Sequence, residues 1–324
     1  MATTALRSAV TATGLRKSFG DKVVLDGIDL EIAEGTVYSL LGPNGAGKTT
    51  AVQILSTLIP ADDGEVTVGG FDLHADPDAV RAVIGVTGQF SAVDNLLTGE
   101  ENLTLMADLH HLDRSAGRHR ARELLEQFDL VEAAGQMAAT YSGGMRRRLD
   151  LAMTLVGTPR VIFLDEPTTG LDPRSRRTMW QIIRQLVADG VTILLTTQYL
   201  DEADQLADRI ALLDHGRVVA EGTPEELKRR IPGGHVRLYF GDHRELERAA
   251  QVVGEGSADA DTLTLRVPTD GSPRSLLALL DRLDLRGICA EQLTAHTADL
   301  DDVFFALTSG HTGRPGVTEG PAQS

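Results

Sequence analysis

Residues 42–49 match the pattern G-x-x-x-x-G-K-[ST], whose glycines let several backbone N–H groups turn toward one anion. The context supports a phosphate-binding loop over an ordinary Gly-rich turn, because an apolar, strand-like run (37–41) precedes it and a helix-like segment (50–58) follows. Lys48 would reach the β- and γ-phosphates, and the Thr49 hydroxyl would ligate Mg²⁺. The predicted nucleoside triphosphate site comprises Gly42, Pro43, Asn44, Gly45, Ala46, Gly47, Lys48, Thr49 and Thr50.

Two adjacent carboxylates follow a second apolar run. Residues 161–164 have the length and composition of a buried strand, and Asp165 and Glu166 come directly after them. In a phosphate-loop protein the first carboxylate can hold Mg²⁺, and the second can orient or deprotonate an attacking water. The alternative is a simple acidic start of a loop, which the position after a buried strand disfavours.

Other polar and aromatic residues give weaker signals. Phe19 precedes a Gly-Asp turn, where it could either stack on a nucleotide base or fill the core beneath the turn. Gln89 opens a loop, a position typical of a surface residue. His110 and His111 have no metal-competent neighbours at suitable spacing, so we interpret them as a solvated helix face. We interpret the three arginines at 146–148 in the same way.

Strand-like and helix-like segments alternate over residues 11–230, which predicts a mostly parallel sheet with ligands at the carboxyl ends of its strands. Residues 93–156 interrupt this alternation with a helical pattern and indicate an inserted helical subdomain. Within it, Ser142 is a suitable N-cap for a helix. Asp172 lies in a turn before an amphipathic helix, and Gln198 follows the buried strand 191–197.

The expected fold is therefore α/β. It has a phosphate-loop domain (residues 11–232) with a parallel sheet core, an antiparallel β region and the helical insertion. An N-terminal extension (1–10) precedes it, and a small α/β domain (233–308) follows a Pro-Gly-Gly boundary. Residues 309–324 are rich in Gly, Thr, Pro and Ser, which predicts a disordered tail.

The bulk composition narrows the possible partners. With 31 Lys and Arg against 47 Asp and Glu, the net charge is −16, which argues against nucleic acid as the main partner. The single cysteine, Cys289, excludes an intrachain disulfide and is typical of a reducing compartment. No apolar run approaches the ~20 residues needed to span a bilayer, so we expect any membrane association to be indirect.

Taken together, these motifs over residues 11–230 resemble the nucleotide-binding subunit of an ATP-binding cassette (ABC) transporter. Residues 141–145, YSGGM, are similar to the LSGGQ-like signature of that family. Gln89 falls at its Q-loop, Asp172 in its D-loop and Phe19 at its base-stacking aromatic, so the resemblance favours stacking for Phe19. Three segments (84–102, 141–152 and 196–210) look like the daunorubicin/doxorubicin-resistance ATP-binding subunits, which are bacterial exporters that pair an ATPase with a separately encoded permease.

The resemblance implies an ATP-hydrolysing subunit that works as a head-to-tail homodimer with Mg²⁺. Each ATP would lie between one phosphate loop and the partner's Ser142, Gly143 and Gly144. Glu166 would be the base, while Asp165 and Gln89 would serve Mg²⁺. The helical subdomain would touch a transmembrane permease, which holds the subunit at the cytoplasmic side of the bacterial plasma membrane. The expected cargo is a drug, an antibiotic or a hydrophobic, lipid-like compound.

Gln198 departs from the family pattern, which generally has His at this position. An imidazole titrates near neutral pH and an amide does not, yet Gln can still donate an N–H to a γ-phosphate. The resistance subgroup also uses Gln here, so we expect Gln198 to be catalytic and hydrolysis to be retained. Tyr141 and Met145 also depart from the signature but leave its Ser-Gly-Gly contacts intact.

Two alternatives remain open. The first is a soluble ABC ATPase that acts on ribosomes or DNA, although this chain has one cassette, no extended heptads and an acidic balance. The second is a nucleotide-gated binding switch in which Gln198 has removed efficient hydrolysis.

Overall fold

The computed structural model describes residues 7–88, 92–229, 234–269, 272–296 and 299–308. The chain divides into two compact units between Pro224 and Glu225. This division lies before the boundary expected at residue 232 and assigns almost all of helix α8 (Pro224–Arg229) to the second unit. Strand β1 begins at Ser8, inside the expected N-terminal extension, and the expected tail lies outside the described residues.

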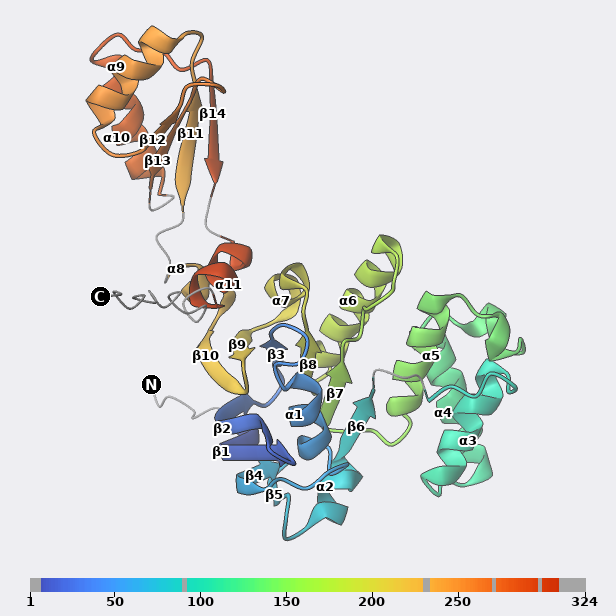
Figure 1. Ribbon diagram of the computed structural model, residues 1–324. Coiled ribbons are helices and arrows are strands. Elements are labelled where there is room, and N and C mark those ends of the chain that lie inside the picture. The colour runs from blue at the N-terminus through green and yellow to red at the C-terminus, as the bar shows by residue number, and fades with distance from the viewer. Residues whose placement is uncertain (1–6, 89–91, 230–233, 270–271, 297–298, 309–324) are drawn as a thin grey trace, which may run out of the picture. The chain divides into compact units, whose positions relative to one another are not determined.

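A six-stranded sheet forms the centre of the first unit, in the order β10-β9-β3-β8-β7-β6 (Figure 1). Neighbouring strands from β9 to β6 are parallel, and only β10 pairs in the antiparallel sense. The strands are β3 (Val37–Leu41), β6 (Ile84–Thr87), β7 (Val161–Asp165), β8 (Thr192–Thr197), β9 (Arg209–Asp214) and β10 (Arg217–Gly222). The mostly parallel sheet predicted from the sequence is confirmed.

Apolar side chains cover both faces of this sheet. Along β7, Val161 and Phe163 join one hydrophobic cluster, while Ile162 and Leu164 join another. Successive side chains of a strand point to opposite faces, so a continuous apolar run is what a strand between two covered faces requires. The burial of β7 fixes its end, and therefore fixes where Asp165 and Glu166 emerge.

A four-stranded antiparallel sheet, in the order β2-β1-β4-β5, supplies the predicted antiparallel region. Its strands are β1 (Ser8–Phe19), β2 (Lys22–Ala33), β4 (Asp63–Val68) and β5 (Phe71–Asp72). The remaining helices of this part of the chain are α1 (Lys48–Leu55), α2 (Pro77–Val83), α6 (Pro173–Ala188) and α7 (Leu200–Leu206). Residues of β1, β2, β4 and α1 share one hydrophobic cluster with β3 and β7. This sheet therefore packs against the strand and the helix that flank the phosphate loop.

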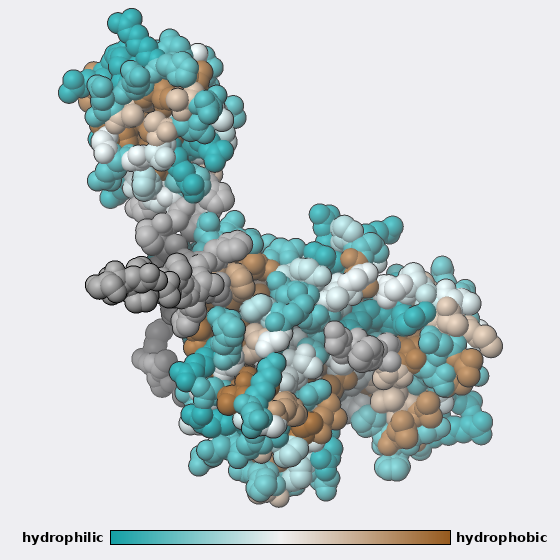
Figure 2. Space-filling view, viewed as in Figure 1, coloured by the Kyte–Doolittle hydropathy of each residue, from teal (hydrophilic) through white to brown (hydrophobic). Residues whose placement is uncertain are grey.

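Helices alone make up the part of the first unit that interrupts the strands. They are α3 (Gly99–Leu109), α4 (Arg114–Gln127) and α5 (Gly143–Thr154), with the short 3-10 turns η1 (Val131–Ala133) and η2 (Ala138–Thr140). Thr98 and Glu101 form a capping box that begins α3. Large apolar side chains also reach the surface here, and Leu96, Leu109 and Met137 are each more than half exposed. Hydrophobic patches are visible on this part of the molecule in Figure 2.

The second unit is a small α/β domain with its own hydrophobic core. Its antiparallel sheet has the order β12-β13-β11-β14, and β12 is a strand that the sequence did not predict. The elements are β11 (His235–Tyr239), α9 (His243–Val253), β12 (Ser257–Asp259), β13 (Thr264–Pro268), α10 (Pro273–Asp284), β14 (Gln292–His296) and α11 (Leu300–Thr308). Throughout the described part of both units, no helix is long and apolar enough to cross a membrane.

Candidate nucleotide-binding and hydrolysis site

The predicted phosphate loop connects β3 to α1, and its glycines adopt backbone conformations that other residues avoid. Gly45 has φ of 81° and Gly47, the N-cap of α1, has φ of 112°. A Cβ on Gly47 would also lie 2.7 Å from a methyl carbon of Leu25 and 2.9 Å from the carbonyl oxygen of Val24. Glycine at 47 therefore serves both the turn and the close approach of β2.

Lys48 is buried at the start of α1, and its side chain bends back over the loop. Its Nζ donates to the carbonyl oxygens of Gly42 at 2.8 Å and Pro43 at 3.1 Å, and lies 3.9 Å from Glu166 Oε1. Burial lowers the pKa of Lys48, while the nearby carboxylates of Glu166 and Asp165 act in the opposite sense. The loop thus holds a cation beside the two carboxylates that follow β7.

Asp165 ends β7 and is almost fully buried. Its Oδ1 accepts from the hydroxyls of Thr49, at 3.3 Å, and Thr196, at 2.5 Å. Carboxylate and hydroxyl oxygens suit Mg²⁺, which usually binds one or two protein groups together with phosphate oxygens and water. Among the described residues no three His, Cys, Asp or Glu side chains gather to hold a metal, and a Mg²⁺ site completed by phosphates needs no such cluster. The pair therefore fits the predicted role.

Glu166 has φ of 49°, a left-handed conformation that costs a residue with a side chain about 1–2 kcal/mol. Two contacts to β8 hold it, because its N–H donates to the carbonyl and the hydroxyl oxygen of Thr196, at 3.2 and 3.0 Å. Its Oε2 accepts from the Thr169 hydroxyl at 3.2 Å, while Oε1 faces Lys48. The turn after β7 therefore aims this carboxylate at the phosphate loop.

A cavity of about 360 Å³ lies between the phosphate loop and Glu166. Its walls include Lys22, Glu166 and several residues of the phosphate loop. Phe19 also lines the cavity, and its side chain is 51% exposed. The exposure of Phe19 and its place in the cavity wall argue against the alternative in which this ring fills the core. Lys17 Nζ lies 5.5 Å from the centre of the ring. Stacking of Phe19 on a base stays a prediction, now supported by its location.

Ser142 and Gly144 lie outside that cavity. The Ser142 side chain caps α5 by accepting from the N–H of Met145 at 3.2 Å. A Cβ on Gly144 would lie 2.5 Å from the hydroxyl of Ser175. That hydroxyl donates to Asp172, whose carboxylate also caps α6. The signature and the predicted D-loop residue are thus neighbours in one chain, away from that chain's own phosphate loop.

Three other predicted site residues are Gly143, Gln198 and Gln89, and the structure describes the first two. Gly143 is the first residue of α5, directly after its cap. Gln198 is half-buried and follows β8 directly, at the carboxyl edge of the sheet where Asp165 also lies. Gln89 lies outside the described residues.

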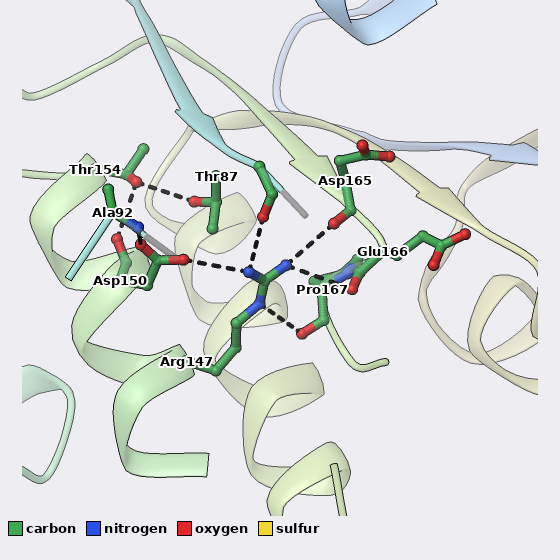
Figure 3. A network of polar contacts seen from close by, with 9 residues as sticks. Thr87, Ala92, Arg147, Asp150, Thr154, Asp165, Glu166 and Pro167 are labelled. Atoms are coloured by element: carbon green, nitrogen blue, oxygen red, sulfur yellow. Dashed lines mark hydrogen bonds and ion pairs between the residues drawn. The ribbon is translucent and has the colours of Figure 1, made fainter. Parts of the chain in front are cut away.

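The arginine run at 146–148 is not a solvated face, and that prediction is wrong. The Arg147 side chain is only 12% exposed and contacts the turn that carries Glu166 (Figure 3). Its guanidinium donates to the carbonyl oxygens of Pro167 and Gly88, both at 2.9 Å. Arg148 is also largely buried and donates to the carbonyl oxygen of Phe128 at 2.8 Å. A carboxylate three residues after Arg147, at Asp150, was the available sequence signal for a buried ion pair.

A buried carboxylate behind the site was not predicted from the sequence. Glu202, in α7, is fully buried, and its Oε1 accepts from the Thr168 hydroxyl at 2.8 Å and from Trp180 Nε1 at 3.2 Å. Burial raises the pKa of Glu202, and hydrogen bonds from Thr197, Thr168 and Trp180 only partly offset this effect. Because Thr168 lies two residues after Glu166, the Glu202 carboxylate connects α7 and α6 to the turn that carries Glu166.

Comparison with known proteins agrees with this geometry. Residues 25–169 match the ABC transporter family. The chain is 48% identical to the daunorubicin resistance ATP-binding protein DrrA2 of Streptomyces coeruleorubidus, over 94% of this chain and 96% of that protein. It is 38% identical to the Nod factor export ATP-binding protein I of Sinorhizobium fredii, over 93% of this chain and 86% of that protein.

A solved structure of an ATP-binding subunit of an ABC transporter is also similar. It superimposes with a TM-score of 0.62 and 27% identity, covering 69% of this chain and 93% of that one.

Proposed function

The chain belongs to the ABC transporter family as an ATP-binding subunit, and on that premise we propose that it hydrolyses ATP to drive export through a separate membrane permease. The observation that carries this proposal is the convergence of Lys48, Asp165 and Glu166. Lys48 Nζ lies 3.9 Å from Glu166 Oε1, and Thr49 lies 3.3 Å from Asp165 Oδ1, all at the phosphate loop.

Each of these groups has a chemical task in phosphoryl transfer to water. Lys48 binds the β- and γ-phosphates, and Glu166 orients and deprotonates the attacking water. Gln198 donates an N–H to the γ-phosphate. Thr49 and Asp165, with help from Gln89, would hold Mg²⁺, which would supply positive charge beside the phosphate oxygens.

The active form is a head-to-tail homodimer. Ser142 and Gly144 lie outside the cavity that the phosphate loop lines, so a second copy is the natural source of a signature for each ATP. The start of α5 carries unpaired backbone N–H groups and a serine hydroxyl, which suit a γ-phosphate. ATP then joins the two copies, and hydrolysis removes the bridging charge.

The helical part, α3 to α5, contacts the permease at the cytoplasmic face of the plasma membrane. Exposed apolar side chains there, which include Leu96, Leu109 and Met137, support a protein contact (Figure 2). The cargo is a drug, an antibiotic or another hydrophobic compound. That range rests on the names of the relatives, one for daunorubicin resistance and one for Nod factor export.

The test is multiple-turnover phosphate release by the full chain reconstituted with its permease. We expect the wild type to turn over many times, Glu166→Gln to retain ATP and accumulate as a dimer, and Gln198→Ala to bind ATP but turn over more slowly. Size-exclusion chromatography with bound-nucleotide analysis checks the dimer.

Release of no more than one phosphate per subunit by the wild type would instead favour the nucleotide-gated switch. Turnover that is insensitive to the permease would favour a soluble ATPase. Wild-type turnover by Gln198→Ala would remove that residue from the catalytic group.

A further inference from the structure

The guanidinium of Arg147 donates hydrogen bonds to backbone carbonyls at the ends of two strands, β6 and β7. Nε donates to the Pro167 carbonyl, Nη1 donates to the Gly88 carbonyl, and Nη2 donates to the carbonyls of Asp165 and Glu166, at 3.1 and 3.4 Å. With the bond from Nη1 to Asp150 at 3.2 Å, the contacts equal the five N–H donors of an arginine. A planar, always charged fork is suited to such a cluster of oxygens, and a lysine is not.

The ion-pair partner of Arg147 extends this network across the segment that contains Gln89. Asp150 Oδ1 accepts from the N–H of Ala92 at 2.9 Å, so the Arg147–Asp150 pair binds the described residues on both sides of positions 89–91. One turn further along α5, the hydroxyls of Thr154 and Thr87 are 2.9 Å apart. Residues at i, i+3 and i+7 of α5 therefore form a polar face against the end of β6 (Figure 3).

The other side of the guanidinium supports the turn that carries Glu166. Three consecutive carbonyls, from Asp165 to Pro167, point at Arg147, while the Glu166 N–H is held by Thr196 on β8. The strained φ of Glu166 persists only where surrounding contacts over-determine it. Removing the guanidinium would remove the hydrogen bonds to all three of these carbonyls.

From these contacts we infer that Arg147 is a positioning residue for ATP hydrolysis, which holds the Glu166 turn in register with the two ends of the segment that carries Gln89. The inference rests on the proposed hydrolytic function. Arg147 does not touch the nucleotide cavity, so it acts through backbone geometry and does not bind ATP. Because α5 begins at Ser142, the same helix that presents the signature to a partner also fixes the catalytic turn of its own chain.

The experiment compares Arg147→Gln and Arg147→Lys with the matched control Arg148→Gln, all as full chains reconstituted with the permease. The control removes the neighbouring guanidinium, which binds Phe128 and Asp129 instead. We expect Arg147→Gln to lower kcat on the order of 100-fold, as a misplaced base does, with KM for ATP unchanged. Arg147→Lys keeps the charge but not the fork, so its kcat lies between those of Arg147→Gln and the wild type.

Chemical rescue by guanidinium ions distinguishes a positioning role of Arg147 from a purely structural one. Millimolar guanidinium ions should raise the kcat of Arg147→Gln and leave Arg148→Gln unchanged, at a concentration that does not alter the unfolding temperature of either protein. Turnover by Arg147→Gln equal to that of Arg148→Gln would overturn the inference. So would a loss of ATP affinity in step with the loss of kcat.

If Arg147→Gln fails to fold, the kcat of the folded Arg147→Lys variant tests the inference. A kcat of Arg147→Lys equal to that of the wild type would contradict it. Absence of multiple turnover in the wild type would instead refute the proposed function, so the two failures are distinguishable.

Discussion

Gly45 and Gly47 both have positive φ, but only Gly47 has no room for a side chain. We expect Gly45→Ala to lower the free energy of unfolding by about 1–2 kcal/mol, since only the backbone conformation resists the change. Gly47→Ala adds an overlap with Val24 and Leu25, so the loss should reach about 2–5 kcal/mol. Urea unfolding measures both. Equal losses would mean that steric crowding at residue 47 contributes nothing.

The site residues that the sequence could group are those that are contiguous in the chain. The phosphate loop and the Asp165–Glu166 pair are each read within one short segment, and the structure brings them together through Thr49 and Lys48. Arg147 was missed because the arginines at 146–148 were interpreted as a solvated helix face. In the structure α5 packs on a second face as well, through Asp150 and Thr154. That contact depends on the position of β6, which no local pattern contains.

At the scale of elements, the contact between α7 and α6 contains one ionisable side chain, Glu202, whose charge state affects the stability of the fold. Burial raises the pKa of Glu202 in the folded state, so ionising this group costs stability. The cost begins as pH rises above the unfolded pKa, about 4.3, and is complete above the folded pKa. Glu202→Gln cannot ionise and keeps an oxygen for Thr168 and Trp180. The unfolding temperature of Glu202→Gln relative to the wild type should therefore rise with pH over this window and then level off.

Thermal unfolding followed by circular dichroism across the acid range measures this difference. The exposed Glu132→Gln is a control for the loss of one negative charge. A difference that stays flat with pH, or an equal slope in Glu132→Gln, would contradict the assignment of the effect to burial of Glu202.

Element prediction succeeded best for short, fully apolar strands and capped helices. The runs that form β3, β7 and β8 were recognised because each is mostly apolar, as burial on both faces requires, and every residue of these strands is buried. Strand β12 was missed because it has three exposed residues and no apolar pattern. It exists through its pairing with β13, which is a tertiary contact.

At the scale of the whole molecule, the two units have separate hydrophobic cores. Every residue of the two cores around the central sheet precedes residue 219, and the core of the second unit lies between residues 236 and 293. We therefore expect a chain that ends after residue 232 to fold and to bind ATP with the affinity of the full chain. Equilibrium titration with a fluorescent ATP analogue measures this affinity.

A folded truncated protein with weaker ATP binding would contradict this expectation and assign the second unit a part in the site. Lys48→Ala in the same truncated chain serves as the negative control, since it removes the cation at the loop.

Trp180 is the only tryptophan of the chain, and its indole shares the Glu202 oxygen with Thr168, two residues from Glu166. Ultraviolet emission excited at the indole band therefore comes from a single place, which two hydrogen bonds through Glu202 connect to Thr168, close to Glu166. The natural protein carries its own optical reporter. Rapid mixing with ATP can follow the timing of events at this turn in unlabelled material, without a dye that would disturb them.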